Sequence, residues 1–296
     1  MAAEASANTR MTIRRMGFAY PPAMSGHWNA KRPEFSQIVN AASLAMPYLE
    51  PYLIRTMLAA RPLTGDEALK AELDAYVAQE ATHFRQHRLF NDALKARGYR
   101  SIETLEAKLA KSYERLEKTH SLAFNLAYAE GFESMALAIG EMLIEDRVFL
   151  FAGSESGVAS LVLWHFVEEI EHKSVAYDVF DHVAGNYFRR VHGFFYATAH
   201  IFMLTRGGYR ALLKEDGLWR NIRSRLALMG IIARIFRKLA PKLARVLVPG
   251  YSPRQVRDPD WALAWAALFR ADNGAPGRLD TNRLAAPHPT ALAPLA

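Results

Sequence analysis

Hydrophobic residues recur every three to four positions along most of this chain, which is the spacing of one face of an α-helix. The periodic runs end at glycines, prolines or short polar loops. The predicted helical segments are 34–60, 64–97, 101–151 with a break near His120, 158–184, 187–206, 218–246 and 260–271. We expect Pro47 and Pro51 to interrupt the first helix, because proline cannot donate a backbone hydrogen bond. We expect Gly207-Gly208 to separate the two helices that follow the fourth.

The lengths of these runs define the fold class. No segment alternates as a half-buried strand would, and there is no glycine-rich phosphate loop, so we predict an all-α protein. Four long helices joined by short links favour a four-helix bundle. The predicted organisation is an N-terminal arm at 1–33, the bundle at 34–185, basic and aromatic helices packed on the bundle at 186–271, and a disordered Pro/Ala-rich tail at 272–296.

Composition narrows the function classes. The 296 residues include no cysteine, which excludes disulfides, thiolate metal sites and a cysteine nucleophile. The N-terminus lacks the apolar core of a secretory signal, and the run 191–205 is too short and polar for a membrane span, so we expect a cytoplasmic protein. The net charge is +7, yet residues 186–254 contain 14 basic and 2 acidic residues, a difference of +12. This asymmetry indicates either an anionic partner or a solvated basic face, and the sequence does not separate the two.

The stretch HFVEEIEHKSVAYD, residues 165–178, sets acids and histidines among apolar residues that otherwise predict a buried helix. At about 100° per residue, His165, Glu169 and His172 lie on one narrow stripe of that helix. Burying an unpaired carboxylate costs several kcal/mol, so a cation must neutralise these groups if they are buried.

The second predicted helix repeats the theme in AQEATHFRQH, residues 78–87. Glu80, His83 and His87 share one face there, and Glu80/His83 has the same Glu-x-x-His spacing as Glu169/His172. Two side chains at i and i+3 can reach one metal ion from one helix. The alternative is that both are solvated pairs that occur by chance.

Each Glu-x-x-His pair follows a helix that carries further acids. In the first helix Glu50 is the only acid between Glu34 and Asp66. In the third helix the candidates are Glu130, Glu133, Glu141 and Glu145. One glutamate from each of two helices plus Glu-x-x-His from each of the other two is the ligand set of ferritin-like dimetal carboxylate bundles. The sequence therefore predicts a ferritin-like bundle that holds two metal ions, whose four positive charges would balance four glutamates.

The segments QEATHFRQH, GFESMALAIGE and WHFVEEIEHKSVAYDVF resemble those of a ferritin-like bacterial family labelled predicted metal-dependent hydrolases, over roughly residues 20–260. This resemblance implies that Glu133 is the third-helix ligand, with Glu130 and Glu141 as alternatives. The chain departs from the family pattern at Ser134 and Ser252, where the family often has histidine. The second departure puts in doubt any role of the loop PGYSP at 249–253 in the site.

The spacing of His165, Glu169 and His172 is also similar to that of p-aminobenzoate N-oxygenase and its relatives, which are di-iron oxygenases with a third histidine ligand. This similarity implies seven metal ligands: Glu50, Glu80, His83, Glu133, His165, Glu169 and His172. The alternative for His165 is that it holds a glutamate instead of the metal. For His87 we favour a supporting or plain core role.

Four charged residues surround the second Glu-x-x-His pair. We expect Glu168 and Glu171 to support the ligands or lie at the surface, and Lys173 and Asp178 to pair with them.

Two chemistries suit such a site. A di-iron pair would bind O2 and, with an electron donor, oxidise a small apolar substrate, and the imidazole share of the ligands suits iron. With redox-inert metals such as zinc, or with manganese, a hydroxide held by the ions would hydrolyse an ester or phosphoester. We favour the di-iron oxygenase, with the metal-dependent hydrolase as the alternative.

The segment 219–247 combines apolar residues with Arg and Lys, as in helices that lie on an anionic membrane. Peripheral membrane contact through this segment is therefore a further hypothesis, and a non-catalytic membrane-associated protein is the third function class. The alternative is a helix docked on the bundle with its arginines in water. No nucleic-acid partner is expected, because no recognised binding motif accompanies the charge.

Overall fold

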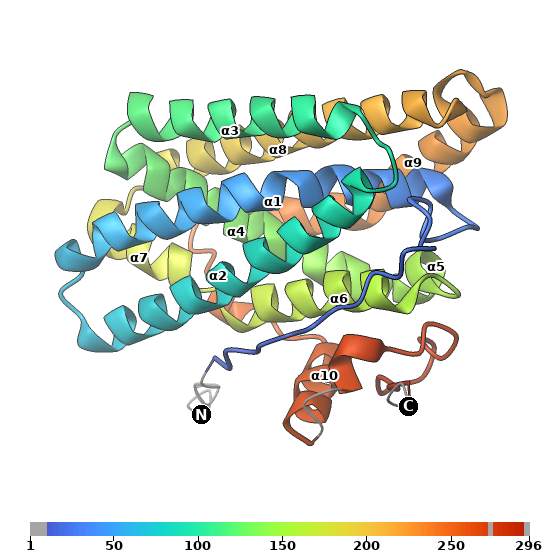
Figure 1. The fold of residues 1–296 in the computed structure, drawn as a ribbon. Coiled ribbons are helices and arrows are strands. Elements are labelled where there is room, and N and C mark those ends of the chain that lie inside the picture. Colours follow the sequence, from blue (N-terminus) through green and yellow to red (C-terminus); the bar gives the residue numbers. More distant parts are fainter. Residues whose placement is uncertain (1–10, 272–274, 293–296) are drawn as a thin grey trace.

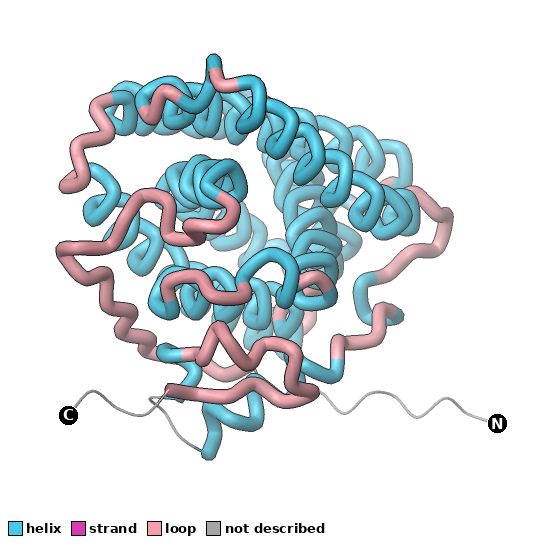
Figure 2. The backbone as a smooth tube through the Cα atoms, turned by 90° about the vertical axis from the view of Figure 1, so that its right-hand side faces the viewer, coloured by secondary structure: helices cyan, strands magenta, loops and turns pink. Residues whose placement is uncertain are grey.

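The computed structural model describes residues 11–271 and 275–292. Within these residues the chain is all-α, as predicted, with one isolated bridge between Leu279 and Ala291 as the sole β-type pairing. The helices are α1 (Pro33–Ala60), α2 (Glu67–Lys95), α3 (Ser101–Thr119), α4 (Leu122–Glu145), α5 (Arg147–Phe151), α6 (Ser156–Glu171), α7 (Val175–Ala184), α8 (Tyr187–Glu215), α9 (Ile222–Val246) and α10 (Asp260–Ala271). The long helices run roughly parallel or antiparallel to one another (Figures 1 and 2).

Helices α1 and α4 occupy the centre of the molecule. Helix α1 packs against α2, α3 and α8, and α4 packs against α6, α7, α8 and α9. The contact between α4 and α8 depends on two glycines, because a Cβ at Gly193 would lie 2.2 Å from the carbonyl oxygen of Ala127 and one at Gly131 would lie 2.5 Å from Cα of Phe194. The absence of these side chains lets the two backbones approach closely.

Helix α1 runs without a break through Pro47 and Pro51, so the predicted interruption is wrong. Each proline frees the carbonyl four residues earlier. Side chains from α2 bind both of these carbonyls, since Asn91 Nδ2 donates to Ser43 O at 3.0 Å and Arg88 Nη2 donates to Pro47 O at 3.5 Å. Tertiary contacts therefore replace the hydrogen bonds that the prolines remove.

Helix α8 likewise continues through Gly207-Gly208, against the prediction of a break. Gly208 serves close packing, because a Cβ there would lie 2.7 Å from Cβ of Ala41 on α1. The chain turns instead at Gly217, whose φ of 73° lies in the left-handed region that favours glycine. The predicted helix 158–184 is divided into α6 and α7 by a turn at 172–174, whereas the break predicted near His120 is confirmed.

The described parts of the N-terminal arm and of the C-terminal segment pack against α6 and its neighbours. In the N-terminal arm, Gln86 Nε2 on α2 donates to Met16 O at 2.6 Å, and Phe18 contacts the ring of Trp164. Residues 275–292 were predicted to be disordered, but in the structure they pack on the helices. Leu279 is fully buried, and its amide donates to Ser160 Oγ at 3.0 Å. The rest of the predicted tail, 272–274 and 293–296, lies outside the described residues. No helix in the described parts of the chain has the length and hydrophobicity needed to cross a membrane.

Candidate metal centre

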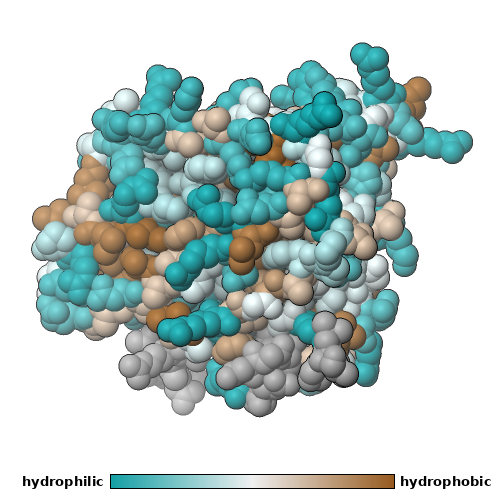
Figure 3. Space-filling view, in the orientation of Figure 1, coloured by the Kyte–Doolittle hydropathy of each residue, from teal (hydrophilic) through white to brown (hydrophobic). Residues whose placement is uncertain are grey.

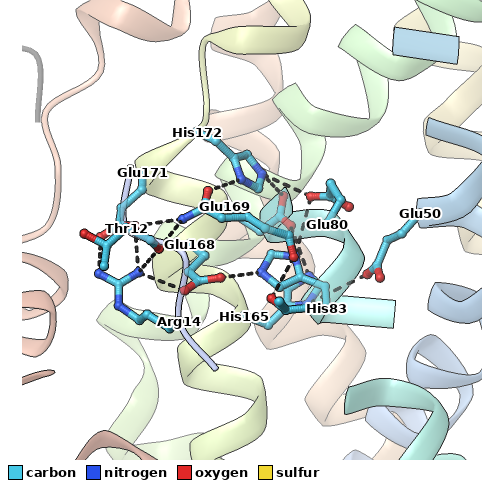
Figure 4. A network of polar contacts seen from close by, with 12 residues as sticks. Thr12, Arg14, Glu50, Glu80, His83, His165, Glu168, Glu169, Glu171 and His172 are labelled. Atoms are coloured by element: carbon cyan, nitrogen blue, oxygen red, sulfur yellow. Dashed lines mark hydrogen bonds and ion pairs between the residues drawn. The ribbon is translucent and has the colours of Figure 1, made fainter. Parts of the chain in front are cut away.

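A buried cluster of acids and histidines lies where α1, α2, α4 and α6 meet (Figure 4). It contains all seven predicted ligand residues, and none is more than 4% exposed. Their potential ligand atoms form two groups, each within 4.8 Å, and the members are Glu50, His83 and His165 in the first group and Glu80, Glu133, Glu169 and His172 in the second. The structure therefore brings together the side chains that the sequence analysis expected to converge. Their role as metal ligands is a prediction.

Helical spacing brings the members of each pair together. On α2, His83 Nδ1 lies 3.5 Å from Glu80 Oε1, and on α6, His165 Nε2 lies 3.2 Å from Glu169 Oε1. His172 follows the last turn of α6, where its amide donates to Glu168 O at 3.0 Å. This cap turns the imidazole back toward the cluster, and His172 Nε2 lies 3.4 Å from Glu80 Oε1.

The cluster leaves many buried polar atoms without a hydrogen-bond partner. These atoms are Oε1 and Oε2 of Glu50, Oε1 of Glu80, Nδ1 of His83, Oε2 of Glu133, Oε2 of Glu169 and Nε2 of His172. Buried polar groups are nearly always hydrogen-bonded, and each buried group without a hydrogen bond costs about 1–3 kcal/mol. Carboxylate oxygens and imidazole nitrogens are metal donors, so the residues present fit a pair of divalent cations.

Two of the histidines are held from outside the cluster. His83 Nε2 lies 2.9 Å from Glu168 Oε2, and His172 Nδ1 lies 3.0 Å from Gln79 Oε1. In each ring the other nitrogen is the one without a partner, and it faces the cluster. Burial alone would lower the pKa of both rings, but the neighbouring carboxylates outweigh it, raise the pKa of His83 to about 10 and raise that of His172 well above its ordinary value. Once a ring gives up one proton to bind a metal, the oxygen acceptor on its outer nitrogen favours the remaining proton there, which leaves the lone pair on the nitrogen that faces the cluster.

Arg14 in the N-terminal arm closes the outer side of this network (Figure 4). Its guanidinium is fully buried, donates to Glu168 Oε1 at 2.8 Å, and binds both oxygens of Glu171 at 2.6 and 2.7 Å. It also lies over the ring of Trp265 on α10. The sequence analysis missed Arg14, because the arm has no periodicity and nothing in its sequence marks one arginine as buried.

The ion pairs of the residues that follow α6 differ from the prediction. Lys173 and Asp178 do not pair with Glu168 and Glu171, because Lys173 binds Asp258 and Asp178 binds Arg254 Nε at 2.8 Å. Arg14 takes the place predicted for Lys173, since Lys173 lies in the turn after α6 and its ammonium group also donates to Val256 O.

His87 stands beside the cluster as a supporting residue. Its Nε2 lies 3.0 Å from His165 Nδ1, and its Nδ1 lies 2.8 Å from Ser43 Oγ. Burial and the neighbouring His165 and His83 lower the pKa of His87 well below its ordinary value, and burial and His83 also lower the pKa of His165. Both rings are therefore neutral at pH 7, the form that can bind a metal.

Burial and mutual repulsion shift the acids of the cluster. Burial and the charges of Glu80, Glu169 and Glu133 raise the pKa of Glu50 well above its ordinary value. Burial and the charge of Glu169 raise the pKa of Glu133 to about 8. Burial alone would also raise the pKa of Glu169, but the charge of His172 and a hydrogen bond from His165 outweigh it and lower that pKa. Without cations, the cluster therefore holds protons at neutral pH.

The alternative third-helix acids have other partners. Ser134 Oγ donates to Glu130 Oε1 at 2.9 Å, and Arg190 Nη1 lies 3.9 Å from the same oxygen. Glu141 binds Arg245 Nη2 at 2.5 Å, and Glu145 binds Lys242 at 2.7 Å. Only Glu133 among the third-helix candidates belongs to a metal-sized group within the described residues.

Comparison with known proteins supplies one match. The model of a family described as predicted metal-dependent hydrolase matches residues 12–257, which is most of the chain. No curated protein and no solved structure matches it. The matched range begins just before Arg14 and includes every residue of the two groups. The chain therefore belongs to the family of predicted metal-dependent hydrolases.

Proposed function

We propose that this chain is a two-metal enzyme whose cations are held by the seven clustered residues. The supporting observation is the set of buried donor atoms without hydrogen bonds, which lie in two groups of metal-binding size. One ion would be held by Glu50, His83 and His165, and the other by Glu80, Glu133, Glu169 and His172.

Glu169 faces both groups and would contribute to holding both ions. Its Oε1 lies 3.2 Å from His165 Nε2 in the first group, and its Oε2 lies 3.5 Å from His172 Nε2 in the second. One carboxylate thus faces both groups with different oxygens. Glu80 has a similar position, because its Oε1 lies 3.5 Å from His83 Nδ1 and 3.4 Å from His172 Nε2.

The reaction that we propose is O2-dependent oxidation of a small apolar molecule with an external electron donor. Iron suits a mixed carboxylate and imidazole donor set, and it supplies the chemistry of O2 reduction. Burial also supports this proposal, because O2 is small and apolar and the cluster is closed to water in the described structure. A surface hollow of about 650 Å³ lies elsewhere and is lined by residues such as His27, Arg97 and Tyr99.

The residues around the cluster would fix the orientation of the ligand side chains and exclude water from them. Tyr76 Oη donates to Glu133 Oε1 at 2.7 Å, which leaves Oε2 of that carboxylate for the metal. The Trp164 ring meets the His83 ring edge-on at 4.9 Å and excludes water from that side. Donors that are fixed before the reaction need little reorganisation during it.

Hydrolysis is the second candidate, and the description of the family supports it. Zinc or manganese at the same residues would activate water for attack on an ester or phosphoester. The buried cluster would have to open for the organic substrate in either reaction, but an ester or phosphoester would bring more polar surface into it than an apolar molecule.

Metal analysis with spectroscopy separates the two candidates. We expect about two iron ions per chain and an absorption band that changes when reduced protein meets O2. Zinc-loaded protein with esterase turnover that a chelator abolishes would establish hydrolysis instead. Protein that binds neither metal above trace level after reconstitution would refute the two-metal proposal.

A further inference from the structure

Large hydrophobic side chains are exposed mainly on α8, on α9 and at Val248 just after α9. Of the nineteen that are exposed among the described residues, twelve lie between Tyr187 and Val248. On the face drawn in Figure 3, by contrast, hydrophobic residues lie in small groups among hydrophilic ones. Single exposed apolar residues are normal, but a concentration of them on neighbouring helices marks an interaction surface.

Helix α9 has two apolar faces. The inner face is buried against the core by Leu228, Ile231 and Leu239. The outer face, which we call the outer stripe, consists of Ile222, Leu226, Met229, Ile232 and Phe236, with exposed fractions of 76%, 62%, 60%, 40% and 68%. At about 100° per residue these five side chains lie within roughly 120° of one another. The core leaves this stripe without a partner.

Helix α8 carries a similar line of exposed aromatic side chains. Phe188, Phe195 and Phe202 follow one another at intervals of seven residues and are 79%, 54% and 44% exposed. The two helices meet where α8 begins and α9 ends, because Tyr187 Oη donates to Leu247 O at 2.7 Å. A short turn joins their other ends.

The basic residues of α9 divide into two sets. One set binds α4 and the residue that follows it, as in the pairs of Arg234 with Asp146 and Arg245 with Glu141. The other set consists of Arg223, Arg225 and Arg237, all exposed. At about 100° per residue, Arg223 and Arg237 lie beside one edge of the outer stripe, and Arg225 lies among its side chains. No carboxylate among the described residues pairs with any of these three, although Arg225 lies 4.0 Å over the ring of Trp219.

We propose that the outer stripe and its three arginines bind α9 to the surface of an anionic lipid bilayer, with the helix axis in the membrane plane. Apolar side chains next to unpaired arginines are the arrangement of interfacial helices, in which the apolar face enters the acyl boundary and the cations meet anionic headgroups. A second copy of this chain is a poorer occupant, because residues 186–254 carry 14 basic and 2 acidic residues and two such faces would repel. This proposal is independent of the metal centre.

The test is flotation of the full-length, metal-loaded protein with vesicles of phosphatidylcholine alone or with about one third phosphatidylglycerol. We expect co-flotation with the anionic vesicles and little with the neutral ones. Leu226→Glu/Met229→Glu/Phe236→Glu should lower the partition coefficient at least about tenfold. Arg223→Gln/Arg225→Gln/Arg237→Gln should lower it about 100-fold at low salt, from about fivefold per cation.

The matched control is Leu58→Glu/Leu63→Glu/Leu89→Glu, which makes the same charge change at residues that are 44%, 56% and 55% exposed on other elements. Binding of the control should equal that of the unaltered protein. Unchanged metal content and circular dichroism in every variant show that the fold is intact. Absence of flotation, equal binding to neutral vesicles, or equal loss in the control would overturn the proposal. A dimer that only the outer-stripe variant abolishes, without flotation, would show that the face binds a second copy.

Discussion

Replacing Glu168 by glutamine tests whether the outer carboxylate tunes the metal centre through His83. The change keeps the size of the side chain but removes the charge that binds both His83 Nε2, at 2.9 Å, and Arg14 Nη1, at 2.8 Å. An amide oxygen at residue 168 is a weaker acceptor for His83 Nε2–H than a carboxylate oxygen. The preference of the His83 ring for a proton at Nε2 and a lone pair at Nδ1 therefore falls. Because Nδ1 is the atom that faces the cluster, metal binding should weaken.

The expected loss can be bounded from comparable sites. Removing the acceptor behind a metal-binding histidine costs 10- to 100-fold in metal affinity, which corresponds to about 1.4–2.7 kcal/mol. Arg14 retains two bonds to Glu171 after the change, so the guanidinium is still paired. We therefore expect Glu168→Gln to fold and to bind the ion of the His83 group more weakly, measured by competition with a chromophoric chelator.

Glu171→Gln is the matched control, because it also removes one carboxylate from Arg14 on the same helix. Its carboxylate binds Arg14 and Gln79 but is not in contact with His83. We expect this variant to lose stability yet to keep its metal affinity within about threefold. Equal losses of affinity in the two variants, or none in either, would show that the Glu168–His83 contact has no role in metal binding.

Three further predictions concern other parts of the molecule. Burial raises the pKa of Glu130 to about 7, so the unfolded chain releases this proton near pH 4.5 and the folded chain releases it later. The unaltered protein therefore loses folding stability as pH rises from 4.5 to 7. Glu130→Gln has no such proton, so its free energy of unfolding should rise relative to that of the unaltered protein by about 3 kcal/mol between pH 5 and 8, measured by urea unfolding. A difference that does not depend on pH would contradict this prediction. Gly193→Ala should destabilise by about 2–3 kcal/mol through its clash with Ala127 O, whereas Gly207→Ala, whose Cβ would meet no atom within 4 Å, should be neutral or slightly stabilising in thermal unfolding. Glu50→Gln should lower the metal content by about one ion per chain and stabilise the metal-free protein at pH 7, because burial and the neighbouring carboxylates raise the pKa of Glu50 and folding must supply a proton that glutamine does not need; loss of stability with unchanged metal content would mean that the residue is purely structural.

The sequence predicted the clustered residues well because the relevant signals are local. An i, i+3 or i, i+4 spacing puts Glu80 beside His83 and His165 beside Glu169 whatever the rest of the chain does, provided that the segment is helical. Within the third helix, however, spacing alone did not separate Glu133 from Glu130, and a family resemblance was needed. Both are fully or almost fully buried, and they differ in their partners, which are Ser134 of the same helix and Arg190 of α8 for Glu130, and Tyr76 of α2 for Glu133.

The wrong predictions of helix breaks share a physical cause. Residues distant in the sequence stabilise the helix at positions where the local sequence favours a break. Asn91 from α2 binds the carbonyl that Pro47 frees, so the helix continues where local rules predict an interruption. Gly208 permits contact with Ala41 instead of ending α8. No pattern in a single sequence reports such contacts, since each depends on which helix packs where.

The distribution of fixed cations separates this centre from an ordinary buried salt-bridge network. Arg14 neutralises Glu168 and Glu171 at the edge of the site, yet within the described residues no lysine or arginine pairs with any of the four clustered carboxylates. A chain that needed only a stable core would have placed the guanidinium between the inner acids, because an unpaired buried charge is the most expensive arrangement. With Arg14 at the edge, protons and the neighbouring histidines neutralise the inner acids when metal is absent. Divalent cations would replace these protons when metal is present. The cost of that arrangement in the metal-free protein is the reason to expect that metal binding and folding stability rise together.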